Sequence, residues 1–257
     1  MSSPNLKAVI FDIGGVVVRS PLIAIAAFEE ELGLPPNYIN ISISRGGQQG
    51  AWQRFERGEI TLFPFYDSFG QELSDTARNN PLYAEYCKLR NRECPKLPEN
   101  LSIDGRELFG RMMRESTVYD QHVVGAIHRI KAARKWRVIA LTNNYSKSEH
   151  TIIGDENGDA ASAPPRDRYP NFSVETELAF LGWSEGATPP KLRALFDDFC
   201  DSSELGMRKP DPEFYLLACK RNRVQPQDCV FLDDLGMNLK VAQRLGMETI
   251  HVPIGGV

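Results

Sequence analysis

The residues best suited to chemistry in this chain are acids that directly follow apolar, β-branched runs. Residues 7–11 (Lys-Ala-Val-Ile-Phe) predict a buried strand that ends at Asp12, and Gly14 and Gly15 predict a tight turn just beyond it. In open α/β sheets, ligands bind in the crevice outside the carboxyl ends of the strands. Asp12 is therefore a candidate nucleophile or metal ligand, although a lone Asp in such a place also commonly caps the next element.

Three further segments place polar side chains at or just after the ends of expected strands. Together they offer a hydroxyl, an amide, an ammonium and two carboxylates: Thr142, Asn143, Lys209, Asp233 and Asp234. Acids this close to Asp12 repel one another unless a cation lies between them. Lys209 supplies one positive charge, and Mg²⁺, a hard cation that prefers oxygen ligands, supplies the rest. A phosphoryl group is the substrate group best served by this combination.

The elements that must position these side chains alternate between helix and strand. A helix is expected over 21–33, and residues 36–114 carry further helical segments with almost no β-branched runs. The alternation then resumes, with expected helices over 122–135, 211–222 and 239–245 and expected strands over 136–141, 196–203, 229–232 and 248–252. This order predicts an α/β fold built on a doubly wound parallel sheet.

The division of the chain follows from the same pattern. We expect residues 1–18 and 115–257 to form a catalytic core, and residues 19–114 to form an inserted helical cap whose closure excludes water and selects the substrate. Residues 154–190 are polar, rich in Gly, Pro, Ala and Ser, and without a clear period. Such a segment predicts a long polar loop within the core.

Composition excludes several other functions. The 257 residues carry a net charge of −4, which gives no support for nucleic-acid binding or for attachment to an anionic membrane. No apolar run reaches the roughly 20 residues of a membrane-spanning helix. The five cysteines form no metal-binding spacing, and the amino end shows no signal-peptide pattern, so that we expect a cytoplasmic protein with reduced thiols. Both a monomer and a homodimer remain open.

The four segments resemble the four motifs of the haloacid dehalogenase-like hydrolase superfamily. They read Phe-Asp-Ile-Gly-Gly-Val-Val (11–17), Leu-Thr-Asn-Asn (141–144), Gly-Met-Arg-Lys-Pro-Asp-Pro (206–212) and Phe-Leu-Asp-Asp-Leu-Gly-Met-Asn (231–238). Residues 45–61 are similar to the cap of one branch of that superfamily. That branch contains the N-terminal phosphatase domain of soluble epoxide hydrolase and the similar domain of acyl-CoA dehydrogenase family member 10.

The resemblance implies a Rossmann-like core and a role for each matching residue. Asp12 would attack phosphorus and form an aspartyl-phosphate. Thr142 and Asn143 would hydrogen-bond the phosphoryl oxygens, and Lys209 would hold the nucleophile and the phosphoryl oxygens together. The expected Mg²⁺ ligands, and the residue expected to brace them, are Asp12, the backbone carbonyl of Gly14, Asp233, Asp234 and, as the brace, Asn238. The expected partner is a small phosphorylated molecule.

Two features of residues 45–61 are candidate substrate contacts. The paired glycines Gly46 and Gly47 expose backbone N–H groups that could contact a phosphate or carboxylate, or they form a simple turn between helices. Trp52 could line a specificity pocket, with packing in the apolar core as the alternative reading.

One departure from the superfamily pattern keeps other functions open. Many of its phosphatases carry a second Asp two residues after the nucleophile, where it protonates the leaving group; here that residue is Gly14, and losing a general acid typically costs about 10²–10⁴-fold in rate. The chain could therefore be a non-catalytic or regulatory binding protein. A 2-haloacid dehalogenase needs neither the proton nor a metal, but the adjacent Asp233 and Asp234 argue against it. Hydrolysis of isoprenyl phosphates or diphosphates is a further alternative.

Overall fold

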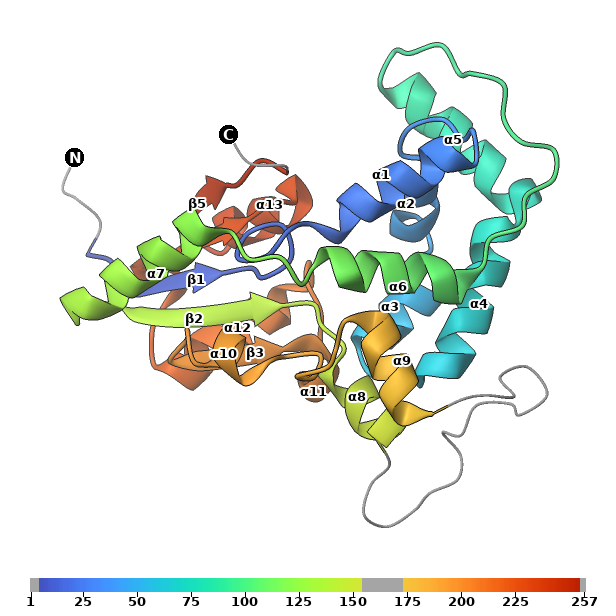
Figure 1. The fold of residues 1–257 in the computed structure, drawn as a ribbon. Helices are drawn as coiled ribbons and strands as arrows, with labels where there is room; N and C mark the ends of the chain where they lie inside the picture. The colour runs from blue at the N-terminus through green and yellow to red at the C-terminus, as the bar shows by residue number, and fades with distance from the viewer. Residues whose placement is uncertain (1–4, 154–172, 255–257) are drawn as a thin grey trace.

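A five-stranded parallel sheet forms the centre of the molecule, in the order β3-β2-β1-β4-β5. The computed structural model describes residues 5–153 and 173–254. Helices α1 to α6 lie between β1 and β2 in the chain and form a body beside the sheet (Figure 1). The predicted fold class, a doubly wound α/β core with a helical insertion, is confirmed.

The strands and helices have the following bounds. The strands are β1 Ala8–Phe11, β2 Arg137–Thr142, β3 Asp198–Asp201, β4 Cys229–Asp233 and β5 Glu248–His251. The helices up to β2 are α1 Pro21–Glu31, α2 Tyr38–Ser44, α3 Ala51–Glu56, α4 Leu62–Ser74, α5 Thr76–Leu89, α6 Gly105–Glu115 and α7 Gln121–Ala133. Those after β2 are α8 Ser146–Ile153, α9 Val174–Leu181, α10 Pro190–Arg193, α11 Ser202–Leu205, α12 Pro212–Asn222, the 3₁₀ turn η2 Pro226–Asp228 and α13 Gly236–Arg244.

The sheet is covered on both faces, as a parallel sheet requires. Successive side chains of a strand point to opposite faces, and all four residues of the central strand β1 are buried. Ala8 and Ile10 belong to the apolar cluster that includes α12 and α13, whereas Val9 and Phe11 belong to the cluster that includes α7 and Leu192 of α10. This double burial explains why the strand reads as a continuous apolar run.

The strand register brings the predicted site residues together. Phe11 pairs with Leu232 of β4 on one side and with Ala140 of β2 on the other. Asp12, the next residue, donates its backbone N–H to the Leu232 carbonyl at 2.9 Å. Because all the strands are parallel, the acids that end β1 and β4 lie side by side at the carboxyl edge of the sheet.

The helical insertion has an aromatic core of its own. The rings of Phe55 and Phe65 stack with centroids 4.0 Å apart, and the rings of Phe55 and Tyr145 stack at 5.2 Å. Tyr145 lies in the chain just after β2, and Leu181 and Trp183 from the following segment join the same cluster. The core of the insertion is thus completed by residues that come after β2 in the sequence.

The segment 154–190 differs from the expected loop where the structure describes it. Residues 154–172 lie outside the described part of the chain, whereas Val174–Leu181 form helix α9 and Pro190–Arg193 form α10. Ser173 caps α9 by accepting a hydrogen bond from the Thr176 N–H, and Leu181 is fully buried against the insertion. Packing against the insertion supplies the apolar contacts that the local composition does not reveal.

A buried ion pair ties α9 to α6. Glu177 is 2% exposed and accepts hydrogen bonds from Arg106 Nη2 at 2.6 Å and from the Tyr66 hydroxyl at 2.8 Å. We expect Arg106→Ala to lower the free energy of unfolding by about 3 kcal/mol, because it leaves a buried carboxylate without its cation. Urea denaturation measures this change. Arg129→Ala, an exposed site on α7, is the control, with an expected change below about 0.5 kcal/mol; equal losses in the two variants would contradict the assignment.

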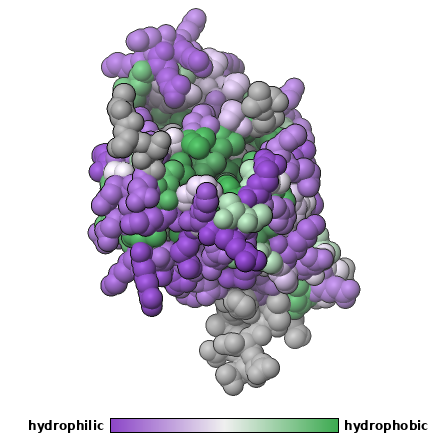
Figure 2. Space-filling model, turned by 90° about the vertical axis from the view of Figure 1, so that its left-hand side faces the viewer, coloured by the Kyte–Doolittle hydropathy of each residue, from purple (hydrophilic) through white to green (hydrophobic). Residues whose placement is uncertain are grey.

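The surface is largely hydrophilic on the side where β1 and β2 begin. Figure 2 shows that face, on which polar side chains surround a smaller group of apolar ones. Throughout residues 5–153 and 173–254, no helix combines the length and the apolar character needed to cross a membrane.

Candidate active site

Lys209 lies at the centre of the carboxyl edge of the sheet, between two acids. Its ammonium Nζ is 2.8 Å from Asp12 Oδ1 and 2.8 Å from Asp233 Oδ2, and its side chain is 1% exposed. The backbone N–H of Ile13 also donates to Asp12 Oδ1, at 2.6 Å. The contacts with Lys209 and with the Ile13 N–H thus hold the carboxylate of Asp12 in one orientation.

Asp234 completes an acidic cluster with Asp12 and Asp233. One carboxylate oxygen from each of these three buried residues lies within 4.8 Å of those of the other two. Ser20, at the start of α1, donates its hydroxyl to Asp234 Oδ2 at 3.1 Å. Three carboxylates against one ammonium leave a net charge of −2, which a divalent cation with oxygen ligands would neutralise. The donor set therefore fits Mg²⁺.

The electrostatics of the cluster follow from its burial. Desolvation raises the pKa of Asp12 well above its ordinary value, and the neighbouring Asp233 and Asp234 raise it further against the opposing effect of Lys209. Desolvation and Asp233 together raise the pKa of Asp234 to about 6. Burial works against the charged form of Lys209, but the carboxylates of Asp12 and Asp233 outweigh it and raise its pKa. The cluster holds excess negative charge at a cost that a bound cation would relieve.

Magnesium affinity is expected to fall as the pH falls through about 6. A carboxyl group with a raised pKa takes up a proton at higher pH than usual, and a protonated Asp234 cannot act as a metal ligand. We expect at least about tenfold weaker Mg²⁺ binding at pH 5 than at pH 7, with protons released on binding. Calorimetric titration in two buffers of different ionisation enthalpy measures both quantities. Equal affinity at the two pH values would contradict the proposed ligand set.

Two asparagines hold Asp233 and Lys209 in place through hydrogen bonds. Asn238 donates its side-chain amide to both oxygens of Asp233, at 3.0 Å each. The Asn143 side chain accepts from the Lys209 backbone N–H at 2.8 Å and donates to the Lys209 carbonyl at 3.0 Å. The Asn143 amide, which the sequence predicts to bind substrate, anchors in this structure the backbone of the segment that carries Lys209.

A second ion pair joins the insertion to the segment that carries Lys209. Arg208 Nε lies 2.5 Å from Glu56 Oε2 at the end of α3, and the Glu56 side chain is 5% exposed. The backbone carbonyl of Glu56 also accepts the Ser202 hydroxyl at 2.5 Å. Sequence reasoning missed this connection, because Glu56 and Arg208 are 152 residues apart.

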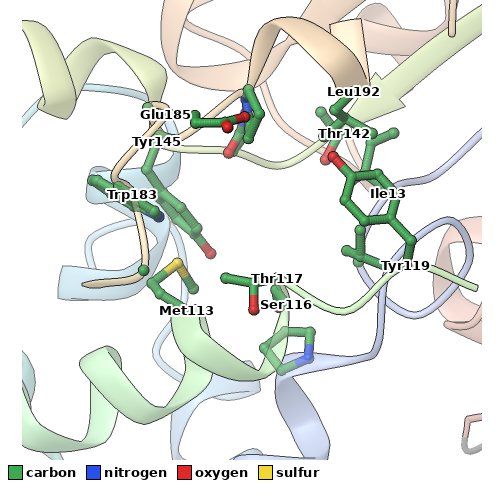
Figure 3. A pocket seen from close by; sticks show the side chains of 18 of the residues that line it. Ile13, Met113, Ser116, Thr117, Tyr119, Thr142, Tyr145, Trp183, Glu185 and Leu192 are labelled. Carbon is green, nitrogen blue, oxygen red and sulfur yellow. The ribbon is translucent and has the colours of Figure 1, made fainter. Parts of the chain in front are cut away.

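A cavity of about 370 Å³ lies between the sheet edge and the insertion. Thr142 and Gly14 belong to its wall, and Figure 3 shows Tyr145 and Trp183 facing Thr142 and Tyr119 across it. Asp12 itself is not part of this wall, although its neighbours Ile13 and Gly14 are. The cavity is of the size that binds small organic molecules, and its wall combines apolar side chains with hydroxyl, amide and charged groups.

The structure does not bring the predicted contacts of the insertion to this cavity. Gly46, Gly47 and Trp52 are absent from its wall. The indole of Trp52 packs in the aromatic core of the insertion, with its centroid 5.5 Å from that of Phe69. An added Cβ at Gly46 would meet the side chain of Gln53, whereas one at Gly47 would meet open space. Helical spacing identified Trp52 as an inward-facing residue without revealing which apolar body it would join.

Sequence reasoning also missed several residues of the site. Ser20 precedes a proline at the start of a helix, a typical N-cap signal, and that signal contains nothing about Asp234. Tyr145 follows the motif at 141–144 directly, so that its proximity to the strand edge was open to prediction. Trp183 and Glu185 belong to the segment 154–190 that the composition indicated to be a loop.

The molecule is a doubly wound parallel sheet with a helical insertion after its first strand and an acidic cluster at the carboxyl ends of its strands. This combination defines a class of α/β hydrolases. The chain belongs to the haloacid dehalogenase-like hydrolase family, since a sequence model of that family matches residues 6–246. The resemblance drawn from the four motifs is thereby confirmed.

Two relatives match almost the whole chain. It is 31% identical over 248 residues to acyl-CoA dehydrogenase family member 10 of Mus musculus, and 28% identical over 248 residues to bifunctional epoxide hydrolase 2 of Sus scrofa. Each alignment covers 96% of this chain, but 18% of the mouse protein and 36% of the pig protein. The chain therefore spans less than a fifth of the length of the mouse protein and a little more than a third of that of the pig protein.

The fold is also similar to that of a HAD family enzyme from Bacteroides thetaiotaomicron. The TM-score is 0.52 at 18% identity, covering 98% of this chain and 96% of that one. The bacterial structure is a complex with magnesium and inorganic phosphate.

Proposed function

We propose that the protein is a Mg²⁺-dependent phosphatase that hydrolyses a small organic phosphate monoester through an aspartyl-phosphate on Asp12. The observation that carries this proposal is the placement of Lys209, whose buried ammonium bridges Asp12 and Asp233 beside Asp234. The magnesium and phosphate bound to the bacterial enzyme of the same fold support the choice of metal and of substrate group.

The hydrogen bonds around Asp12 indicate how it would act. Its Oδ1 accepts from Ile13 N–H and from Lys209, so that Oδ2 is the oxygen that would attack phosphorus. Lys209 favours the ionised form of Asp12 against the effect of burial, and it would stabilise negative charge that develops on the phosphoryl oxygens. The Thr142 hydroxyl, in the cavity wall, would hydrogen-bond one of those oxygens.

The hydrogen bonds to Asp233 distinguish it from the other predicted metal ligands. Both oxygens of Asp233 accept hydrogen bonds from the protein, one from Leu235 N–H at 2.7 Å and the other from Lys209. Asp233 would therefore chiefly hold Lys209, and Asp12, Asp234 and the Gly14 carbonyl would hold Mg²⁺. When bound there, the cation would neutralise phosphoryl charge during transfer.

Phosphate release from a panel of monoesters tests the proposal. The panel contains sugar, acyl, aryl and isoprenyl phosphates, with Mg²⁺ or with excess EDTA, and chloride release from 2-chloropropionate is measured in parallel. We expect release of phosphate from at least one ester, its loss in EDTA, and no release of chloride. Chloride release that is independent of Mg²⁺ would replace the phosphatase by a dehalogenase.

A non-catalytic binding protein is the second candidate, and Gly14 favours it because glycine offers no side chain to protonate a leaving group. Calorimetric binding of inorganic phosphate in the presence of Mg²⁺, together with no turnover of any ester in the panel, would establish this alternative.

A further inference from the structure

Hydrolysis of an alkyl phosphate needs a proton donor for the departing alkoxide, and the proposed function leaves this role unfilled. Asp12 is the attacking group, and Asp233 is fully engaged by hydrogen bonds from Lys209, Leu235 and Asn238. Gly14 faces the cavity without a side chain. The donor must therefore come from another part of the cavity wall.

We propose that Glu185 is the general acid and base of this site. Among the residues of the cavity wall that the structure describes, Glu185 carries the single carboxyl group. Its side chain points into the cavity from the segment that follows Trp183, toward the side where Thr142 lies (Figure 3). This inference rests on the proposed phosphatase function, because a dehalogenase needs no such donor.

The other titratable groups of the wall are poorer donors. Burial raises the pKa of the Tyr145 hydroxyl well above its ordinary value, and burial together with the charge of Glu185 raises the pKa of Tyr119. Lys191 lies over the Tyr119 ring, 5.5 Å from its centroid. Glu185 and Tyr119 both line the cavity, and Figure 3 shows them on different sides of it.

The segment that carries Glu185 is anchored to the strand edge. Thr188 Oγ1 accepts from the Asn144 side chain at 2.7 Å, and Asn144 directly follows Asn143 at the end of β2. The backbone N–H of Ala187 donates to Glu149 Oε2 at 2.7 Å, and Gly186 adopts a φ of +92° against the same carboxylate. These contacts hold the backbone that directly follows Glu185 against the end of β2 and the start of α8.

Glu185 would act in both halves of the reaction. In the first half, Asp12 Oδ2 forms a bond to phosphorus, the P–O ester bond breaks, and the leaving oxygen takes the electron pair and the proton of the Glu185 carboxyl group. In the second half, the Glu185 carboxylate takes a proton from water, whose oxygen attacks phosphorus and releases Asp12. The sum is ester plus water giving alcohol plus phosphate, with Glu185 protonated again at the end.

The dependence on the leaving group tests this role. Benzyl phosphate releases an alkoxide that needs a proton, whereas 2,4-dinitrophenyl phosphate releases a stable phenolate that does not. In single-turnover measurements, Glu185→Gln should slow benzyl alcohol release by about 10²–10⁴-fold and change dinitrophenolate release by less than about threefold. Glu30→Gln, an exposed site on α1, is the matched control and should alter neither rate.

A second substitution returns a carboxyl group to the same cavity. An added Cβ at Gly14 would lie 3.4 Å from Pro21 Cδ, an ordinary contact, so that Gly14→Asp can be accommodated. In the Glu185→Gln background, Gly14→Asp should recover benzyl alcohol release by at least about tenfold.

The outcomes separate this inference from the proposed function. Unchanged benzyl alcohol release in Glu185→Gln, or an equal loss with both esters, would overturn the role of Glu185 while leaving the phosphatase in place. A wild-type protein that hydrolyses neither these esters nor any of the panel, with Mg²⁺ present, would overturn the phosphatase itself.

Discussion

Asp12→Asn should reduce Mg²⁺-dependent phosphate release by roughly 10⁴-fold or more, the scale on which enzymes lose activity when a covalent nucleophile is removed. An amide oxygen is a far weaker nucleophile than a carboxylate. The substitution also removes one of the two charges that hold Lys209 at 2.8 Å and one of the proposed Mg²⁺ ligands. Because Asn matches Asp in shape and its carbonyl can still accept from Ile13 N–H, the fold should persist.

Acid-quenched single turnover with a ³²P-labelled ester tests the chemistry directly. The wild-type protein should retain label as the aspartyl-phosphate, and Asp12→Asn should retain none, while both give the same circular dichroism spectrum. If the variant kept more than about a hundredth of the wild-type rate, Asp12 would not be the nucleophile.

Gly15→Ala should weaken Mg²⁺ binding by about 10–100-fold, as loss of a group that positions a ligand does. A Cβ at residue 15 would lie 2.1 Å from Asp234 Oδ2, far inside contact distance, so that the carboxylate would have to leave its place in the cluster. The φ of +83° adds strain, because L side chains disfavour this conformation. Phosphate release at limiting Mg²⁺ should fall with the affinity.

Gly206→Ala separates the two causes. Gly206 has a φ of +67°, and an added Cβ there would meet nothing within 4 Å. It therefore carries the conformational cost without the collision. Calorimetric titration with Mg²⁺ should show near wild-type affinity for Gly206→Ala and the large loss for Gly15→Ala. The same affinity in both variants would mean that Gly15 does not control Asp234.

Gly14 and Gly15 show which part of the structure a local sequence pattern predicts and which part it does not. The pair predicts a tight turn, and a bridge between Gly14 and Val18 follows it in the structure. Nothing in the sequence shows that Gly15 lies against Asp234, 219 positions away, where a side chain would displace a carboxylate. Turn chemistry is local, and that contact depends on the packing of β1 beside β4.

For the segment 154–190 after β2, the local sequence pattern gave a wrong prediction in the part that the structure describes. Its composition favours a loop, yet the part from Ser173 onward contains a capped helix, a buried Leu181 and the wall residues Trp183 and Glu185. The apolar residues are few, and they suffice because the insertion provides the surface that covers them. Likewise, helical spacing marked Trp52 as buried without distinguishing a cavity wall from the aromatic core where it lies.

The sequence by itself determined the fold class, the family and the meeting of Asp12, Lys209 and Asp233 at one edge. These follow from local patterns, because strands that alternate with helices become parallel and parallel strands end on the same side. Only the tertiary structure decided what surrounds that edge: Ser20 on Asp234, Glu56 on Arg208, and the cavity that Glu185 enters. Such contacts join elements far apart in the chain, and hydrophobic periodicity states which face is buried but not what it is buried against.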